Sequence, residues 1–319
     1  MTRSRRAKWV ALVSVAAIAM ASATIGATHG AFADQTSNGG NIITAVPDWR
    51  GPTVSPIAIG KNTGNATGFI KPSSVYRVYA NVTDLGTPPS GTSTVTANVS
   101  NVTAGQTAVP LVAGSYTAGG QSYNYRSATL TAGALGNGVQ SFTVTATDVA
   151  TNVTTVNGNV TIDNVAPAPS DMSATGGISG RPEVGDVFAL TTTDTLDTFS
   201  LLSTWNGSAT TVQVRFVNQA GGDLLQVWNS AGTTQVAFGT IDLGRTDFTT
   251  TTLSFNGSTM TQTNGVINVV LGGPIVGTVT TVGGKGKMTW TPAATITDRA
   301  GNALPTAVFN EPNPNDEDF

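Results

Sequence analysis

The residue types that most active sites need are nearly absent from this chain. It has no cysteine and one histidine, His29, which lies in a segment that we interpret as a leader. Without that leader the chain cannot form a cysteine nucleophile, a Ser-His-Asp triad or a zinc site made of histidine and cysteine. The sequence therefore predicts a protein that is not an enzyme.

Pairs of carboxylates could still hydrolyse glycosides, since that reaction needs two acids at a suitable separation. Most of the acids are aspartates at expected strand ends and turns, and Glu183 is the main glutamate of the expected folded part. Aspartate accepts hydrogen bonds from nearby backbone N–H groups, so turn formation accounts for these residues without catalysis. The aspartates in question are Asp84, Asp148, Asp163, Asp186, Asp194, Asp197, Asp242 and Asp298.

Calcium is the cofactor that the residue types fit best, because it takes hard oxygen ligands from Asp, Asn and backbone carbonyls. We expect Asp148, Asp163 and Asn164 to meet near one end of the first domain and to form a calcium site. The alternative is that the Asp-x-Ala-x-Asn turn around Asp148 satisfies its own polar groups and that no cofactor is present.

Two tryptophans could bind a glycan or another ligand through an aromatic face. Trp49 and Trp205 are flanked by polar or turn residues and are expected to be exposed. Trp228 lies beside an expected hairpin turn over 229–232, Trp290 continues an alternating strand, and both are expected in the core. The competing interpretation of Trp49 and Trp205 is packing at the edge of the core.

The start of the chain has the three parts of a secretory signal peptide. A basic segment precedes an apolar run over 10–21, and Ala31-Phe32-Ala33 offers a cleavage site. Cleavage before Asp34 predicts a secreted, extracellular protein, free or associated with the cell envelope, with no membrane insertion after cleavage. The basic residues of the leader are Arg3, Arg5, Arg6 and Lys8.

The net charge of the chain is −3, and it becomes more negative once the basic leader is removed. An acidic surface repels phosphate backbones, so nucleic acid is excluded as a partner. The partners that remain are polysaccharides or proteins of the cell wall or the extracellular space.

Elements that could position these side chains follow from the apolar pattern. Apolar and polar residues alternate over 75–82, 140–147 and 211–217, and β-branched residues are frequent there. This period of two predicts half-buried strands. Similar patterns occur over 266–271, 276–282 and 288–290, and 194–202 is the best candidate for a helical turn. Many short strands predict an all-β sandwich or barrel architecture.

Prolines 167 and 169 mark the clearest internal boundary, because proline cannot donate to a sheet. The predicted organisation is a signal peptide over 1–33, a flexible lead-in over 34–45, β-sandwich domains over 46–165 and 166–310, and an acidic solvated tail over 311–319. The lead-in also offers a route to assembly by strand exchange.

A short internal repeat suggests that the two domains are related. The sequence Asp148-Val149-Ala150-Thr151-Asn152 lies near the end of the first, and Asp298-Arg299-Ala300-Gly301-Asn302 near the end of the second. Both place Asp, Ala and Asn at the same offsets. Thr151 stands where the second turn has glycine, so we expect the first turn to differ in geometry.

These residues carry a resemblance to a known family. The aromatic strand over 138–148, the Asp-x-Ala-x-Asn turn and the exit Asp163-Asn164-Val165-Ala166-Pro167 resemble the end of a bacterial Ig-like domain. The opening over 181–190 is similar to that of Ig-like domains found in tandem on bacterial, often actinobacterial, surface proteins. The resemblance implies two Ig-like β-sandwiches in tandem after a cleaved signal peptide.

The function expected from these observations is a structural or adhesive role at or outside the bacterial cell envelope. The alternative is a carbohydrate- or ligand-binding protein that uses exposed Trp49 and Trp205.

Overall fold

The structure is a computed structural model, which describes residues 37–38, 41–42, 48–62, 66–86, 88–312, 315 and 317–319. The expected signal peptide over 1–33 lies outside the described residues, as does most of the lead-in. Of the lead-in, the structure shows two short antiparallel strands, β1 (Ser37–Asn38) and β2 (Asn41–Ile42). No helix in the described part of the chain is long and apolar enough to span a membrane.

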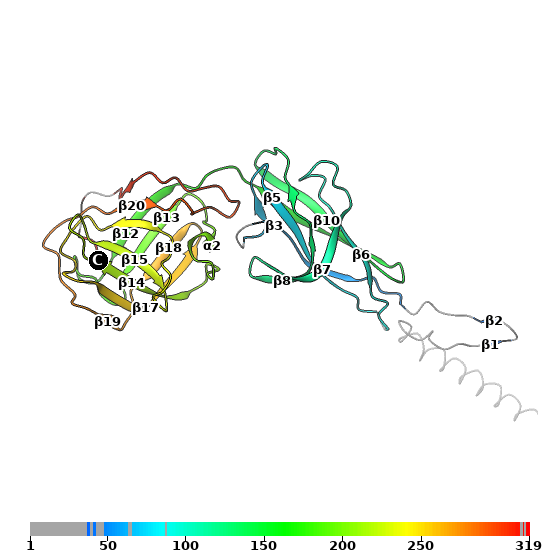
Figure 1. The fold of residues 1–319 in the computed structure, drawn as a ribbon, viewed down its shortest axis with the longest axis horizontal. Helices are drawn as coiled ribbons and strands as arrows, with labels where there is room; N and C mark the ends of the chain where they lie inside the picture. The colour runs from blue at the N-terminus through cyan, green and yellow to red at the C-terminus, as the bar shows by residue number, and fades with distance from the viewer. Residues whose placement is uncertain are drawn as a thin grey trace, which may run out of the picture. The chain divides into compact units, whose positions relative to one another are not determined.

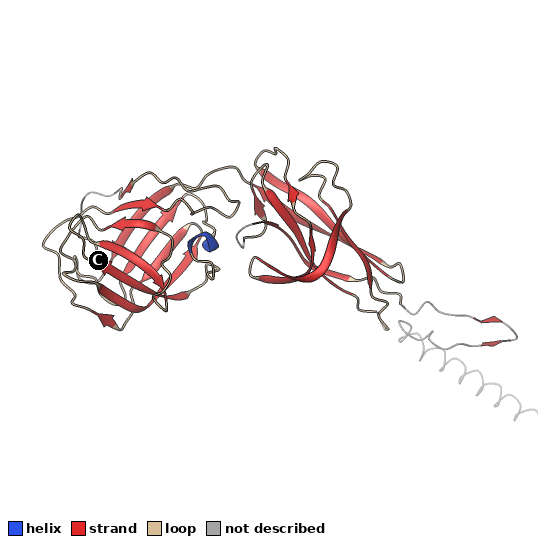
Figure 2. Ribbon diagram, in the orientation of Figure 1, coloured by secondary structure: helices blue, strands red, loops and turns tan. Residues whose placement is uncertain are grey.

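The protein is all-β, as the alternating pattern predicted, and its strands form two large sheets (Figures 1 and 2). The strands of the first sheet follow one another in the order β3 (Thr53–Lys61), β5 (Val75–Thr83), β8 (Gln121–Ser127), β7 (Val109–Ala118), β6 (Thr92–Asn98), β10 (Gly138–Asp148), β11 (Val153–Ile162) and β4 (Phe69–Ile70), with β9 (Leu130–Thr131) beside β5.

The first sheet curls so far that its two ends nearly meet. At one end of the sheet, β4 pairs in parallel with β11. The residues just before β4 bridge the other end, where Gly60 pairs with Thr67 and the N–H of Gly68 donates to the carbonyl of Ile59. The inner face therefore encloses a core, which carries the residues that the alternation placed inside. Those residues are Tyr76, Val78, Ala80, Val82, Phe142, Val144 and Ala146.

The second sheet is built from the C-terminal half of the chain and is also nearly closed (Figure 2). Its strands follow the order β12 (Pro169–Thr175), β13 (Val187–Thr192), β18 (Val266–Val270), β17 (Leu253–Thr263), β14 (Thr210–Val217), β15 (Leu224–Asn229), β16 (Gly239–Asp242), β20 (Thr289–Pro292) and β21 (Phe309–Asn310), with β19 (Ile275–Val276) beside β17.

The helical turn expected over 194–202 is present as α2 (Thr198–Leu201). Asp197 caps it, because its carboxylate accepts a hydrogen bond from the N–H of Phe199 at 3.1 Å. The strand expected over 276–282 is wrong beyond Val276. Gly277 takes a φ of +108° and ends the pairing of β19, and the next strand begins at Thr289.

Aromatic rings fill the core of the second sheet. Phe216 contacts Phe255 and Phe319, with ring centroids 5.7 and 5.1 Å apart. Phe319 is only 1% exposed, and the N–H of Gly180 donates to its carbonyl. The expectation of a solvated segment over 311–319 is therefore wrong at Glu311, Asp318 and Phe319, which are 2%, 4% and 1% exposed. Burial of the Phe319 ring removes apolar surface from water and so stabilises the fold. Trp290 is fully buried as expected, and its indole N–H donates to the carbonyl of Phe238.

The described chain forms two compact units. One comprises the described residues up to Val54 together with Val82–Thr94 and Thr145–Thr155, and the other comprises Ser55–Asn81, Val95–Val144 and the described residues from Val156 onward. The pairing of the first sheet ends at Ile162 and that of the second begins at Pro169. The boundary predicted between 165 and 166 falls in this stretch without strands.

Gly239 offers a test of the second sheet. Its φ is +93°, and a Cβ there would lie 2.1 Å from the backbone carbonyl oxygen of Thr291 on the paired strand. We expect Gly239→Ala to lower the free energy of unfolding by about 2–4 kcal/mol, because the strand pair must separate to admit the methyl group. Gly221→Ala is the control, since a Cβ there meets no atom within 4 Å. Equal urea midpoints for the two variants would contradict this placement.

Candidate functional site

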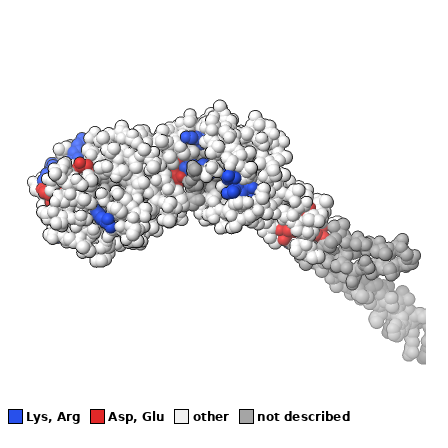
Figure 3. All heavy atoms as spheres, viewed as in Figure 1, with Lys and Arg blue, Asp and Glu red and all other residues white. Residues whose placement is uncertain are grey.

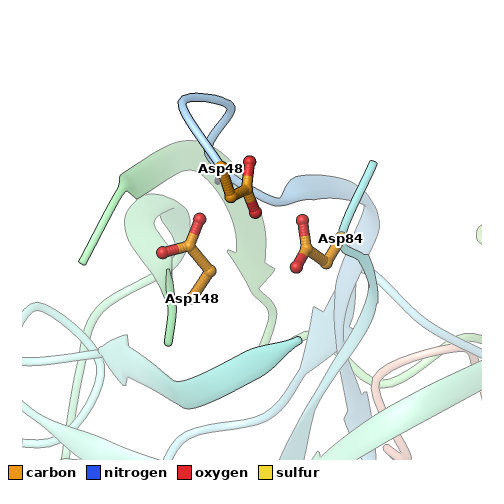
Figure 4. Close-up of side chains that lie close together, drawn as sticks. All are labelled: Asp48, Asp84 and Asp148. Carbon is orange, nitrogen blue, oxygen red and sulfur yellow. The ribbon is translucent and has the colours of Figure 1, made fainter. Parts of the chain in front are cut away.

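Three aspartates of the first compact unit converge on one point (Figure 4). Asp48 precedes β3, Asp84 follows β5, and Asp148 ends β10. One carboxylate oxygen from each lies within 4.8 Å of the others. We call Asp48, Asp84 and Asp148 the first acidic cluster.

Backbone N–H groups hold the carboxylates of the first acidic cluster in place. Asp48 accepts from the N–H groups of Arg50 and Ser90, each at 3.0 Å. Asp84 accepts from the N–H of Gly91 at 2.5 Å. These bonds fasten the loop after Asp84 to the segment that enters β3. The hydrogen bond from the Arg50 N–H is the main reason that the pKa of Asp48 lies below its usual value, against the opposing effect of burial.

The second compact unit contains an acidic cluster of the same composition. Asp163, Asp194 and Asp298 each place one carboxylate oxygen within 4.8 Å of the others, and we call them the second acidic cluster. Burial raises the pKa of Asp194, and the charges of Asp163 and Asp298 raise it further.

The two clusters are built from matching residues. Asn152 donates its side-chain N–H to the Asp148 carboxylate at 2.8 Å and to the Asp48 carbonyl at 3.2 Å. Asn302 does the same with the Asp298 carboxylate at 2.8 Å and the Asp163 carbonyl at 3.1 Å.

The segments that enter the two clusters match as well. Asp48 and Asp163 each begin an Asp-x-x-x-Pro segment that ends at Pro52 and Pro167. The repeat is therefore longer than the Asp-x-Ala-x-Asn turn by itself.

Thr151 follows the geometry of the repeat, contrary to expectation. Its φ is +71°, close to the +97° of Gly301, and both residues donate their N–H to the carbonyl of the preceding aspartate. The N–H of Asn152 donates to the Asp148 carboxylate, and this bond closes the turn with either threonine or glycine at the position before the asparagine. Thr151 therefore accepts a left-handed conformation that is unfavourable for a β-branched residue.

Charged groups lie next to the second acidic cluster. The ammonium group of Lys61 donates to the Asp298 carbonyl at 3.2 Å and pairs with the Asp197 carboxylate at 2.6 Å. Both side chains of that ion pair are more than nine-tenths buried. The guanidinium of Arg299 lies 3.8 Å from the ring centroid of Phe69.

The expected calcium ligands do not meet. Asp148 belongs to the first acidic cluster and Asp163 to the second, because the ten residues of β11 separate them along the chain. The backbone N–H of Asn164 donates to the Asn137 side chain at 2.9 Å. Each cluster by itself offers three of the six to eight oxygens that calcium takes. Asp148 and Asp163 therefore do not form one site as predicted, and calcium binding stays a prediction.

The two tryptophans that were predicted to bind a ligand differ in their exposure to solvent. Trp49 is 71% exposed, as expected. Trp205 is 2% exposed, and its indole N–H donates to the Ser208 carbonyl, so the expectation of an exposed Trp205 is wrong. Its ring belongs to the core of the second sheet. Trp228, expected in the core, instead lies half-buried beneath the guanidinium of Arg215, at 4.3 Å.

The sequence analysis did not predict four of the cluster aspartates as site residues, namely Asp48, Asp84, Asp194 and Asp298. The shared Asp-x-x-x-Pro spacing was a signal that could have pointed to Asp48. Asp84 and Asp194 have no such signal beyond following a strand, since only the fold brings them to the other aspartates.

Comparison with known proteins adds little to this geometry. No protein-family model matches the chain, and no curated protein matches it. The crystal structure of dimeric latent PorU from Porphyromonas gingivalis is similar over 70% of this chain and 20% of PorU, with 11% sequence identity and a TM-score of 0.25. The chain thus spans about a fifth of the length of PorU. A likeness at that score carries no argument about fold or function.

The Thr151 turn gives a reciprocal test of the repeat. Thr151→Gly should raise the free energy of unfolding by about 1 kcal/mol, because glycine adopts a positive φ without steric cost. Gly301→Thr should lower it by at least about 1 kcal/mol for the same reason. Both changes are measured as shifts in urea unfolding, and shifts of the same sign would contradict the shared geometry.

Asp194 gives a prediction about pH. Its folded pKa lies above the usual 3.8, so its ionised form destabilises the fold at neutral pH, and this effect is lost as pH falls through the folded value. We expect Asp194→Asn to unfold at a higher urea concentration than the parent at neutral pH, and the difference to shrink toward pH 3.8. Asp171→Asn is the control, because Asp171 accepts a similar bond from the next residue and belongs to neither cluster. A gain that does not change with pH would contradict the proposed cause.

Proposed function

We propose that this chain is a secreted, non-catalytic protein of two tandem Ig-like β-sandwich modules with a structural or adhesive role at or outside the bacterial cell envelope. The observation that carries the proposal is the structural role of the acidic side chains. The aspartates of both clusters accept hydrogen bonds from the backbone of their own loops, so their carboxylates serve to hold the ends of the sheets.

The sheet geometry supports the sandwich interpretation. Each sheet curls until its inner face packs against itself, and apolar residues alternate toward that face. A sheet that curls in this way can form the two packed layers that an Ig-like module requires. The repeated Asp-x-x-x-Pro and Asp-x-Ala-x-Asn segments support two modules of common design.

The low charge of the surface favours an adhesive or spacer role over binding by electrostatic attraction. Only 10% of the residues are charged, and the face in Figure 3 is largely free of charged side chains. A surface of this kind binds through shape, hydroxyl groups and local apolar contacts.

A saccharide-binding role is the second candidate, and exposed Trp49 favours it. An exposed indole can stack on a sugar ring. Trp205 is withdrawn from this proposal because its ring is buried.

A retention assay tests the adhesive role. Residues 34–319 are incubated with cell-wall fractions, extracellular polysaccharides and extracellular proteins, and the bound fraction is measured. We expect retention by at least one of these materials without any change in its chain length. Hydrolysis that is lost in an Asp84→Asn variant would overturn the non-catalytic assignment, and no retention by any material would overturn the adhesive one.

A further inference from the structure

The outer face of the second sheet carries a layer of polar side chains at its centre. β14 lies between β15 and β17, and every second residue of a strand points away from the core (Figure 1). The buried residues that alternate with them, such as Val214, Val227 and Phe255, belong to the core. The outward residues are half-buried, and we call them the polar face: Gln213, Arg215, Gln226, Trp228, Ser254 and Asn256.

Strand register places these side chains side by side. Gln213 lies opposite Trp228 on β15 and opposite Asn256 on β17. In the next outward row, Arg215 lies opposite Gln226. Residues that are directly opposite on antiparallel strands have their Cβ atoms about 4.5–5.5 Å apart. The two rows therefore form one continuous surface.

Hydrogen bonds hold the polar face in one arrangement. The Nε–H of Arg215 donates to the side-chain carbonyl of Gln213 at 2.8 Å, and the Gln213 amide donates to the side chain of Asn256. A second guanidinium N–H donates to the carbonyl of Gly232 at 3.1 Å, and the guanidinium lies 4.3 Å from the ring centroid of Trp228. Fixed arginine and glutamine side chains have already lost up to about 2 kcal/mol of rotamer freedom each, so a ligand does not have to order them.

The guanidinium of Arg215 forms no ion pair with the described residues. Described residues accept from two of its five N–H groups, so both N–H groups of Nη1 and one of Nη2 remain for a ligand. A planar guanidinium binds a carboxylate through two parallel hydrogen bonds. The net charge of −3 repels anions at long range, but salt screens that repulsion beyond about 8 Å. The polar face therefore favours a ligand with a carboxylate.

Amide and hydroxyl groups beside the guanidinium match the hydroxyl groups of a sugar. The side-chain oxygen of Gln226 accepts from the indole N–H of Trp228 at 3.1 Å, and no described residue accepts from its NH2 group. Ser254 lies on the other side of Arg215, opposite it on β17, and Asn256 follows two residues later on the same face. Groups that donate and accept hydrogen bonds at this spacing can bind neighbouring hydroxyl groups of a sugar ring.

A peptide matches the polar face less well than a saccharide does. An extended peptide binds by adding a strand to a free sheet edge, whereas β14 is already paired on both sides. Peptide side chains also need apolar anchor points, and none of the six residues of the polar face is an exposed apolar residue.

We propose that the polar face binds an acidic saccharide, with the guanidinium of Arg215 bound to the carboxylate of a uronic acid unit. Gln226, Ser254 and Asn256 bind hydroxyl groups of the same saccharide, and the indole ring of Trp228 supports the guanidinium. This inference rests on the proposed adhesive role and names the class of polysaccharide that the protein retains.

Uronate polymers test the proposal. Binding of the full chain to polygalacturonate, alginate and hyaluronate is measured by biolayer interferometry in buffer with EDTA, and each polymer is compared with its methyl ester. At least one polymer should bind at least about tenfold more tightly than its ester, because esterification removes the charge that Arg215 binds. Binding of no polymer, equal binding of each polymer and its ester, or equally tight binding of polyglutamate would overturn the proposal.

Matched arginine variants locate the binding. Arg215→Gln should weaken it by at least about tenfold, and Arg215→Lys should weaken it as well, because lysine keeps the charge and loses the planar fork. Arg126→Gln is the control, since Arg126 on β8 lies 4.2 Å from the ring centroid of Tyr116 in the same kind of contact. Unchanged binding by Arg215→Gln would overturn the proposal.

A glutamine variant keeps the test decisive if Arg215→Gln does not fold. Gln226→Ala leaves the guanidinium in place and should weaken binding by about threefold to tenfold, with a urea midpoint close to that of the parent. Gln219→Ala, which changes an exposed residue outside the polar face, should leave binding unchanged. Equal binding by the two glutamine variants would contradict the assignment of this face.

The same assays separate this inference from its rivals. Loss of polymer binding in Trp49→Ala, with Arg215→Gln unaffected, would assign the saccharide to Trp49 and overturn the inference. Binding that appears only when calcium replaces EDTA would assign it to the acidic clusters and overturn it as well. If cell-wall fractions or extracellular proteins retain the chain and no uronate polymer binds, the adhesive role stands and only this inference fails.

Discussion

Carboxylates bonded to backbone N–H groups hold the loop ends of this protein together. A nearly closed sheet must return its chain through loops whose N–H groups have no strand partner, and an unpaired buried N–H is costly. Aspartate solves this locally, as Asp298 does by accepting from the N–H groups of Gly301 and Asn302 at 2.7 and 2.8 Å. Asn302 then extends the bonding to the segment that enters the module.

That constraint explains why acids gather at the loop ends. Three segments must meet at one end of the sheet, each brings an aspartate, and their carboxylates converge as a result. The repulsion is offset by hydrogen bonds at Asp48, whose pKa is lowered, and persists at Asp194, whose pKa is raised. The same architecture therefore has different electrostatic consequences in the two clusters.

The residue directly after each aspartate differs between the two clusters. At the first cluster these positions hold Trp49, Leu85 and Val149, and at the second they hold Asn164, Thr195 and Arg299. These residues are apolar and exposed at the first cluster and polar at the second.

The sequence by itself determined the all-β class, the turn at Asp148 with its repeat, and the strands over 75–82, 140–147 and 211–217. These features follow from period-two alternation and local side-chain hydrogen bonds, which act over a few residues. Tertiary structure decided the burial of Trp205 and Phe319, the separation of Asp148 from Asp163, and the meeting of Asp48, Asp84 and Asp148. These features depend on which strands are neighbours and how far the sheet curls. Strand order is set by packing between distant segments, and no local pattern encodes it.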